Sequence, residues 1–257
     1  GAGRCCFVCP GKAKVTADKA FLEPLSGDPS LSLLTRTRLL SVEPAPRRGA
    51  PAQVLVEGPQ GRRRLSCRAA VLACGSLATP YFLRRLGLPA GDSLSLHPAA
   101  EIMAVFDEPV LAWQGVPQAG GLDDPDEPRL RYESAFVPPE LAAVTLPLEG
   151  RQLKWWMDRY DRVASFGFMV RDSSRGSIRY PFGRRWPLIR YYVDAEDAAR
   201  MIRGMRFIGR ALFAAGARQV LLPINRKPNA FASARELESA DLSGVRPGRL
   251  HAMAFHP

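Results

Sequence analysis

The feature that most constrains the fold is an apolar run that ends at a glycine and leads into a helix start. Residues 69–74 read AAVLAC, which is typical of a strand buried on both faces. Gly75 ends the run, and Thr79 with Pro80 predicts a helix because proline is tolerated in a first helical turn. In open α/β folds, ligands bind where such a strand meets such a helix. We therefore expect a ligand-binding sheet edge here.

The chain after residue 98 predicts a different architecture. Strands are expected over residues 31–42, 53–57, 65–74, 99–105, 130–136, 219–224 and 250–255, and over 164–170, 177–180 and 188–193. The short turns between the last three predict an antiparallel meander. The clearest helix begins after Asp194, has Asp197 as the carboxylate of a capping box, and ends at Gly216. Helices are also expected over residues 138–146 and around 155–160, and residues 225–248 are polar and loop-like.

The formal net charge of +11 raises the possibility of nucleic-acid binding. Only five of the 36 basic residues are lysines, and arginine abundance fits a biased codon pool as well as a selected surface. No recognition helix or aromatic-plus-basic RNA motif accompanies the charge, so a solvated surface is the favoured interpretation. No apolar run approaches the roughly 20 residues needed to cross a bilayer.

Five cysteines raise the question of metal or redox chemistry. Cys6 and Cys9 are spaced as a zinc or redox pair, but a structural zinc site needs four ligands and no second pair exists. Cys67 and Cys74 lie in or beside strand-like runs, where thiols behave as small hydrophobes. We favour plain loop and core cysteines over a metal or disulfide role.

Three stretches together resemble the glucose–methanol–choline (GMC) family of FAD-dependent oxidoreductases. Residues 71–89 are similar to the family's second signature, although Leu86 precedes Gly87 where serine is usual. Residues 172–176, 189–197 and 216–218 resemble the substrate-domain strands and long helix. The final Phe255, His256 and Pro257 resemble the His-Pro motif that lies beside the flavin.

The resemblance implies the fold class and the domain boundaries. The class is α+β within an α/β parent, with a partial FAD-binding, Rossmann-like domain over residues 1–98. A substrate-binding domain with a largely antiparallel sheet covered by helices spans residues 99–224. Residues 225–257 form a loop and a return strand that carries the catalytic histidine.

The resemblance also implies the chemistry and the site residues. FAD accepts hydride from the CH–OH group of a small-molecule alcohol while His256 takes the hydroxyl proton. Leu39 matches the position whose backbone meets the adenine, and Ala73, Cys74 and Gly75 match the turn beside the adenosine half. Hairpin and sheet core is an equally good explanation of these four residues. The alcohol, the oligomeric state and the choice between oxidase and dehydrogenase stay open.

A dinucleotide-binding chain needs G-x-G-x-x-G between a strand and a helix, and this sequence lacks it. With Gly1 rather than methionine at the start, and Pro257 directly after an apolar run, we interpret the chain as an internal fragment. We expect the fragment alone to be inactive and its parent to be a bacterial cytoplasmic enzyme, although targeting signals are unreadable here.

Several alternatives remain. One alternative is a non-catalytic remnant or binding module without cofactor. Another is a basic nucleic-acid module, which predicts salt-dependent DNA retention. His97, before Pro98, is interpreted as a turn residue and His251 as structural. Glu133 faces the substrate cavity or pairs with an arginine.

Overall fold

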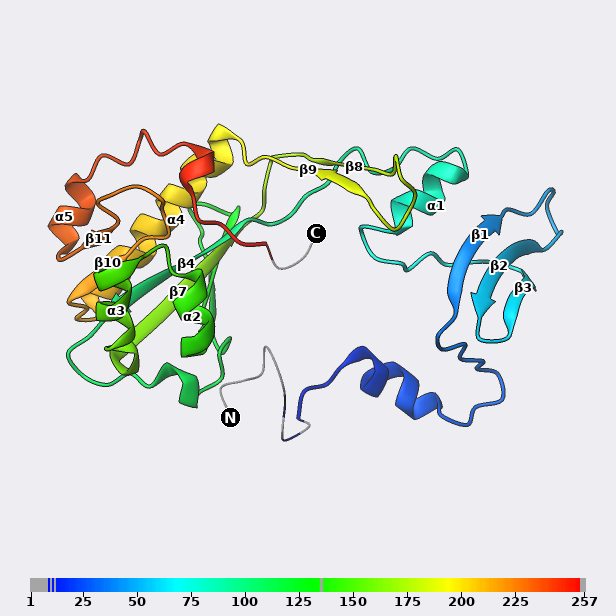
Figure 1. The fold of residues 1–257 in the computed structure, drawn as a ribbon, viewed down its shortest axis with the longest axis horizontal. Coiled ribbons are helices and arrows are strands. Elements are labelled where there is room, and N and C mark those ends of the chain that lie inside the picture. The colour runs from blue at the N-terminus through cyan, green and yellow to red at the C-terminus, as the bar shows by residue number, and fades with distance from the viewer. Residues whose placement is uncertain (1–8, 10, 12, 135, 255–257) are drawn as a thin grey trace. The chain divides into compact units, whose positions relative to one another are not determined.

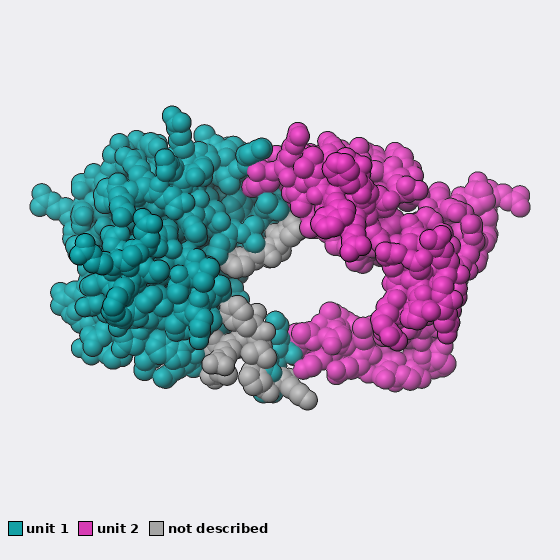
Figure 2. All heavy atoms as spheres, viewed as in Figure 1, with its two compact units in different colours: residues 1–14, 95–174, 192–257 teal, residues 15–94, 175–191 magenta. Residues whose placement is uncertain are grey.

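The structure of the chain consists of two compact units. The computed structural model describes residues 9, 11, 13–134 and 136–254 (Figure 1). Unit 1 contains Gly1–Lys14, Ser95–Ser174 and Tyr192–Pro257, and unit 2 contains Val15–Leu94 and Arg175–Tyr191 (Figure 2). Both combine helix with antiparallel sheet, so the α+β class is confirmed. The Rossmann-like character of residues 1–98 and the boundaries at residues 98 and 224 stay predictions.

Unit 1 is built on a six-stranded sheet in the order β11-β10-β4-β7-β6-β5, with every neighbouring pair antiparallel. Its strands are β4 (Ala99–Val105), β5 (Gly121–Asp123), β6 (Leu130–Ser134), β7 (Val163–Val170), β10 (Gln219–Leu221) and β11 (Ala230–Phe231). Its α-helices are α2 (Pro139–Thr145), α3 (Gly150–Met157), α4 (Ala195–Ala214) and α5 (Ala234–Ser239), with 3-10 turns at Ala112–Gln114, Tyr160–Arg162 and Pro247–Arg249.

The sheet of unit 1 carries a separate apolar core on each face. Side chains alternate along a strand, so β4 contributes to both. Ile102 and Ala104 pack with residues of α4, whereas Met103 and Val105 pack with residues of α2 and α3. Figure 1 shows α4 on one side of the sheet and α2 and α3 on the other. Both faces of β4 are covered, which explains why its sequence is apolar almost throughout. The strand predicted over residues 99–105 is confirmed.

The N-terminus of α4 is held by a buried network of hydrogen bonds. The Asp194 side chain accepts from the Asp197 backbone N–H at 2.7 Å, which confirms the predicted N-cap. The reciprocal half of the predicted capping box does not form. The Asp194 N–H instead donates to Ser174 Oγ at 2.9 Å, and the Asp197 carboxylate accepts from the backbone N–H groups of Ser173 and Ser174, each at 2.8 Å. Asp197 also pairs with Arg200 at 2.6 Å.

A glycine in α4 sets how closely the helix lies on the sheet. A Cβ on Gly204 would lie 3.0 Å from three ring atoms of Phe168, on β7. That distance is shorter than ordinary van der Waals contact, so the ring occupies the space that a side chain would need. The helix ends as predicted, because Gly216 adopts a φ of +98° directly after the last turn.

Unit 2 contains two small antiparallel sheets and one helix. Its elements are β1 (Arg38–Glu43), β2 (Ala52–Gly58), β3 (Gly61–Cys67), α1 (Thr79–Arg85), β8 (Ser177–Arg179) and β9 (Leu188–Arg190), with a π-helical turn at Asp18–Leu22 and a 3-10 turn at Glu23–Leu25. β1, β2 and β3 form a meander, and β8 pairs with β9. The predicted α1 is confirmed, with Pro80 in its first turn and Gly87 at a φ of +77° after its end.

The predicted buried strand over residues 69–74 is wrong for this structure. β3 ends at Cys67, and residues 69–74 have no strand assignment; Val71 is 90% exposed. A strand buried on both faces needs hydrogen-bonded neighbours at its edges and layers above and below it. Nothing in the described ranges supplies them, so apolar composition alone does not produce a strand.

The predicted meander over residues 164–193 is also wrong. β7 is a central strand of the six-stranded sheet, whereas β8 and β9 pair only with each other and belong to unit 2. A Cβ on Gly176 would lie 2.4 Å from the Arg190 carbonyl oxygen, so only glycine permits this approach of the two hairpin arms. Short turns predict a hairpin correctly but do not indicate which sheet it joins.

Residues 225–248 are not a continuous loop. α5 begins after Ser233, whose hydroxyl accepts from the Glu236 N–H at 3.1 Å, and the Glu236 carboxylate accepts from the Ala232 N–H at 2.7 Å. Serine followed three residues later by glutamate is a capping-box signal that the sequence analysis overlooked.

Within the described ranges, neither α4, which at 20 residues is the longest helix, nor any other helix combines the length and apolarity that a membrane span requires.

We expect Asp197→Asn to lower the free energy of unfolding by about 3–5 kcal/mol, since it removes the buried carboxylate that pairs with Arg200 and that also accepts from the Ser173 and Ser174 N–H groups. Urea unfolding followed by tryptophan fluorescence measures the change. Glu196→Gln is the matched control, because Glu196 also pairs with Arg200 but its side chain is 65% exposed, so the expected loss is below about 1 kcal/mol. Equal losses in the two variants would contradict the buried network.

Candidate functional site

Three residues on neighbouring strands place two carboxylates in one row across the sheet of unit 1. Gly167 on β7 is paired with Glu101 on β4 at one edge and with Glu133 on β6 at the other. Directly paired residues of antiparallel strands lie on the same face. This face is opposite to α4, because Ile102, next to Glu101, packs in the α4 core. The two carboxylates therefore flank a residue without a side chain on the face opposite α4.

Glu101 is the buried member of this row. Its Oε1 atom has no access to solvent and no hydrogen-bond partner in the described part of the chain, while the Ser165 hydroxyl bonds to the carboxyl group. Burial raises the pKa of Glu101 above the usual glutamate value, and the hydrogen bond from Ser165 offsets only part of that rise. The carboxyl group is therefore biased toward its protonated, neutral form.

The sequence left open whether Glu133 faces the substrate cavity or pairs with an arginine. It is half-buried and forms no ion pair with any arginine that the structure describes. It lies on the same face as Glu101, as the predicted orientation toward a cavity requires.

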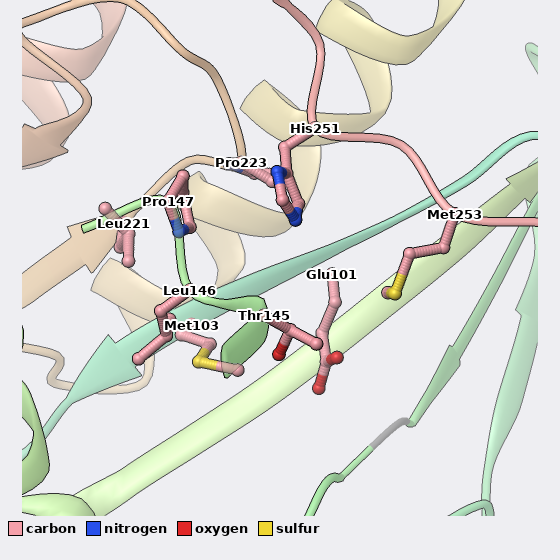
Figure 3. A pocket seen from close by; sticks show the side chains of 9 residues that line it. All are labelled: Glu101, Met103, Thr145, Leu146, Pro147, Leu221, Pro223, His251 and Met253. Carbon is pink, nitrogen blue, oxygen red and sulfur yellow. The ribbon is translucent and has the colours of Figure 1, made fainter. Parts of the chain in front are cut away.

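A small cavity lies against Glu101 (Figure 3). Its walls are Glu101, Met103, Thr145, Leu146, Pro147, Leu221, Pro223, His251 and Met253. Its volume of about 20 Å³ exceeds the ~10–15 Å³ that one water molecule needs. The walls are apolar except at Glu101, Thr145 and His251, so polar groups converge on a space the size of one small ligand group.

The segment before His256 is fixed beside β4. The His251 N–H donates to the Pro223 carbonyl oxygen at 2.8 Å, and Met253 and Ala99 exchange backbone hydrogen bonds of 2.7 and 2.9 Å. These bonds bring the side chains of His251 and Met253 to the cavity wall. The expected strand over residues 250–255 is thus reduced to isolated bridges at Leu250 and Met253. His256 lies outside the described residues, and its catalytic role stays a prediction.

The four predicted cofactor residues all lie in unit 2. Leu39 lies on β1 opposite Val56, and its carbonyl oxygen accepts from Arg184 Nη1 at 2.8 Å. Ala73, Cys74 and Gly75 form an exposed turn before α1, in which the Cys74 N–H donates to Thr79 Oγ1 at 3.2 Å.

The backbone at this turn is open to a ligand. Gly75 has a φ of +79°, and no atom lies within 4 Å of the position that a Cβ would take. A flat group is therefore able to approach the main chain, which fits the adenosine half of a dinucleotide. The sequence has no glycine-rich phosphate cradle to accompany it. The assignment of the four residues stays a prediction.

The surroundings of His97 and of the described cysteines fit structural roles. His97 has a φ of +48°, and the carbonyl of the following Pro98 accepts from the Val170 N–H at 2.9 Å, which suits the predicted turn. Cys9, Cys67 and Cys74 are free thiols, and Cys9 Sγ accepts from the Lys14 N–H at 3.2 Å. Cys6 lies outside the described residues.

Comparisons with known proteins identify the family. Residues 1–99 match the family model described as GMC oxidoreductase. The uncharacterized GMC-type oxidoreductase Rv0492c of Mycobacterium tuberculosis is 37% identical over 194 residues, covering 74% of this chain and 30% of the relative. The uncharacterized GMC-type oxidoreductase y4nJ of Sinorhizobium fredii is 32% identical over 230 residues, covering 88% of this chain and 45% of the relative.

A plant protein with a named activity is also similar. The long-chain-alcohol oxidase FAO1 of Arabidopsis thaliana is 29% identical over 176 residues, covering 63% of this chain and 22% of the relative. Among solved structures, the OxyS anhydrotetracycline hydroxylase from Streptomyces rimosus aligns over 78% of this chain and 34% of its own at 15% identity, but the TM-score of 0.23 is too low to indicate a shared fold.

The chain thus spans 30% to 45% of the length of the two bacterial relatives. The similarity to these relatives extends well beyond residues 1–99, since it covers up to 88% of the chain. Family model and relatives agree on one assignment: this chain belongs to the GMC oxidoreductase family.

Proposed function

We propose that this chain is part of a flavin-dependent oxidoreductase that oxidises the CH–OH group of an alcohol. The similarity to GMC-type oxidoreductases over up to 88% of the chain is the observation that carries the proposal. FAD, when bound, supplies the acceptor for the substrate's hydride. The chain's own residues contribute a proton acceptor, part of the cofactor's binding surface and a cavity wall.

His256 is the proposed proton acceptor. A neutral imidazole takes up a proton readily near physiological pH, because its unperturbed pKa is about 6.5. The hydroxyl proton leaves the substrate for the imidazole as the carbon-bound hydrogen leaves with its electron pair, so the alcohol becomes a carbonyl compound. The backbone bonds at His251 and Met253 support this role, since they hold the segment before His256 beside β4, with both side chains at the cavity that Glu101 lines.

Leu39 and the turn formed by Ala73, Cys74 and Gly75 are the proposed contacts to the adenosine half of FAD. The exposed backbone of the turn and the open space beside Gly75 support this role. The pyrophosphate needs a glycine-rich cradle that this sequence does not contain. We therefore expect the 257-residue chain alone neither to bind FAD tightly nor to oxidise alcohols.

A long-chain primary alcohol is the first substrate to test, because the relative with a named activity is a long-chain-alcohol oxidase. Sugars, sterols and choline-like alcohols provide the comparison. The expected result is that the product of the longest reading frame containing this chain purifies with a flavin spectrum, and that one alcohol class bleaches it anaerobically. A product without flavin, or a flavin that none of these alcohols reduces, would contradict the proposed function.

His256→Asn should slow anaerobic flavin reduction by about 10²–10⁴-fold, the usual contribution of a positioned general base, while the flavin stays bound. Stopped-flow absorbance measures this rate. His97→Asn is the matched control: it removes an imidazole from unit 1, and asparagine tolerates the left-handed backbone at that position. Equal reduction rates in the parent protein and His256→Asn would exclude His256 as the base.

A further inference from the structure

Glu101 presents a buried polar atom without a partner. Its Oε1 atom has no solvent access and no hydrogen bond in the described part of the chain. Such an atom normally bonds to a water molecule or a ligand, because leaving it unpaired destabilises the fold. The same carboxyl group lines the cavity described above, so a partner for Oε1 has a place to bind.

Two further polar side chains reach this cavity. The Thr145 hydroxyl donates to the Leu141 carbonyl oxygen at 3.0 Å, which leaves the lone pairs of its oxygen available to accept. His251 lies on the cavity wall, with its backbone N–H already bonded to Pro223. Figure 3 shows these side chains around one space, with those of Glu101 and Thr145 next to each other. A bound hydroxyl group therefore has Glu101 and Thr145 as neighbouring polar partners, with His251 on the wall of the same cavity.

The cavity favours a neutral group over an ion. Met103, Leu146, Leu221 and Met253 form apolar walls, and none of the lysines and arginines that the structure describes lines the space. A bound anion would have no cation to pair with, and a bound cation would meet a carboxyl group that burial biases toward its neutral form. A hydroxyl group both donates and accepts, which matches a protonated carboxyl on one side and hydroxyl or imidazole acceptors on the other.

We propose that the cavity formed by Glu101, Thr145 and His251 binds one neutral hydroxyl group, to which Glu101 donates a hydrogen bond. The proposal rests on described residues alone and does not depend on bound flavin. The hydroxyl belongs either to a water molecule or to an alcohol.

An open groove lies next to the cavity. Leu146, Pro147 and His251 line both the cavity and an open groove of about 510 Å³. The groove also contains polar residues, among them Gln152, Asn225 and Asn229. These shared walls place the cavity next to a space large enough for the rest of an alcohol molecule.

The protonation of Glu101 predicts a pH dependence of stability. The folded chain holds this proton more tightly than the unfolded chain, whose glutamates titrate near 4.5. As pH rises, the unfolded state therefore loses this proton first. The free energy of unfolding falls over the window between pH 4.5 and the raised pKa of Glu101. The folding equilibrium constant should drop by at most about tenfold per pH unit in this window, and Glu101→Gln should remove that component.

Several polar and titratable groups face Glu101, and the test needs a control that leaves them unchanged. They are Ser165 from β7, Thr145 from α2, His251 from the return segment, and Tyr160, whose pKa is raised by burial and further by Glu101 and Glu140. Glu133→Gln is the matched control, since it removes a carboxyl group from the same face and row. Urea unfolding across the window should show the slope in the control and not in Glu101→Gln. A slope of equal size in Glu133→Gln and Glu101→Gln would contradict the proposal that Glu101 is protonated.

The hydroxyl partner is tested directly by infrared spectroscopy of the 257-residue chain, without flavin. At neutral pH we expect a carbonyl band of a hydrogen-bonded, protonated carboxyl group that Glu101→Gln removes and Glu133→Gln keeps. Thr145→Val should shift the band, because it removes one polar wall of the site at nearly constant volume.

Methanol and 1-butanol distinguish the two sources of the hydroxyl. A band shift that saturates with either alcohol assigns the site to a ligand's hydroxyl group, and insensitivity to both combined with a shift in Thr145→Val assigns it to bound water. Two results would overturn the proposal. One is an ionised Glu101 at neutral pH; the other is a carbonyl band that shows no hydrogen bonding and does not shift with Thr145→Val or with either alcohol. Because no flavin is involved, this result is independent of whether the parent protein oxidises alcohols.

Discussion

The architecture of unit 1 depends on two buried carboxylates that fix the points where the chain passes between the units. Asp197 accepts from the N–H groups of Ser173 and Ser174, where the chain leaves unit 1, and Ser174 Oγ accepts from Asp194, where the chain has returned. Asp172 accepts from Ser95 and from the Leu96 N–H, where the chain enters unit 1 after Leu94. Hydrogen bonds inside unit 1 thereby hold three of the crossings. At two of them the acceptor is a carboxylate, and such charge-assisted hydrogen bonds are among the strongest available to a backbone.

Burial and charge oppose each other in this network. Burial by itself would raise the pKa of Asp197, but the hydrogen bonds from Ser174, Arg200 and Ser173 outweigh it and lower the pKa. Glu101 lies at the opposite extreme, since a single serine does not offset its burial and its pKa is raised. One unit thus contains an ionised carboxylate that organises the backbone and a carboxyl group biased toward its neutral form that faces a cavity. The number of donors around each explains the difference.

The sequence predicted the elements whose signals are local. α4 was found from its N-cap, its apolar side and Gly216, and the central strands β4 and β7 from their apolar runs. Residues 69–74 and the β8–β9 hairpin were misplaced because strand pairing depends on distant residues, which local composition does not specify. In the site, Leu39, Ala73, Cys74 and Gly75 were proposed from a family resemblance. Glu101 was overlooked, although a lone carboxylate in a strand that is otherwise apolar on both faces is itself a signal.

Arginine has a structural use that bears on the basic composition. Arg206 donates to the carbonyl oxygens of Leu237, Glu238 and Ala240, so one guanidinium group secures α5 and the chain after it. Arg249 bonds to the Asn225 carbonyl in the same way. A guanidinium offers five donors in a rigid plane, whereas an ammonium group is a compact point charge. Substituting lysine at such positions would preserve the net charge and lose the bonds, so the preference for arginine does not require an external anionic partner.

Both faces of the sheet in unit 1 carry an apolar core, but the face opposite α4 also carries a row of carboxyl groups. Toward α4 the strands present Ile102, Ala104 and Phe168, and the Phe168 ring fills the space at Gly204. Toward the opposite side, the row through Gly167 carries Glu101 and Glu133, which contribute little apolar burial. A carboxyl group in that position costs folding free energy unless something in the cavity bonds to it. The apolar cores on both faces supply the stability that lets this unit keep Glu101 buried beside a cavity.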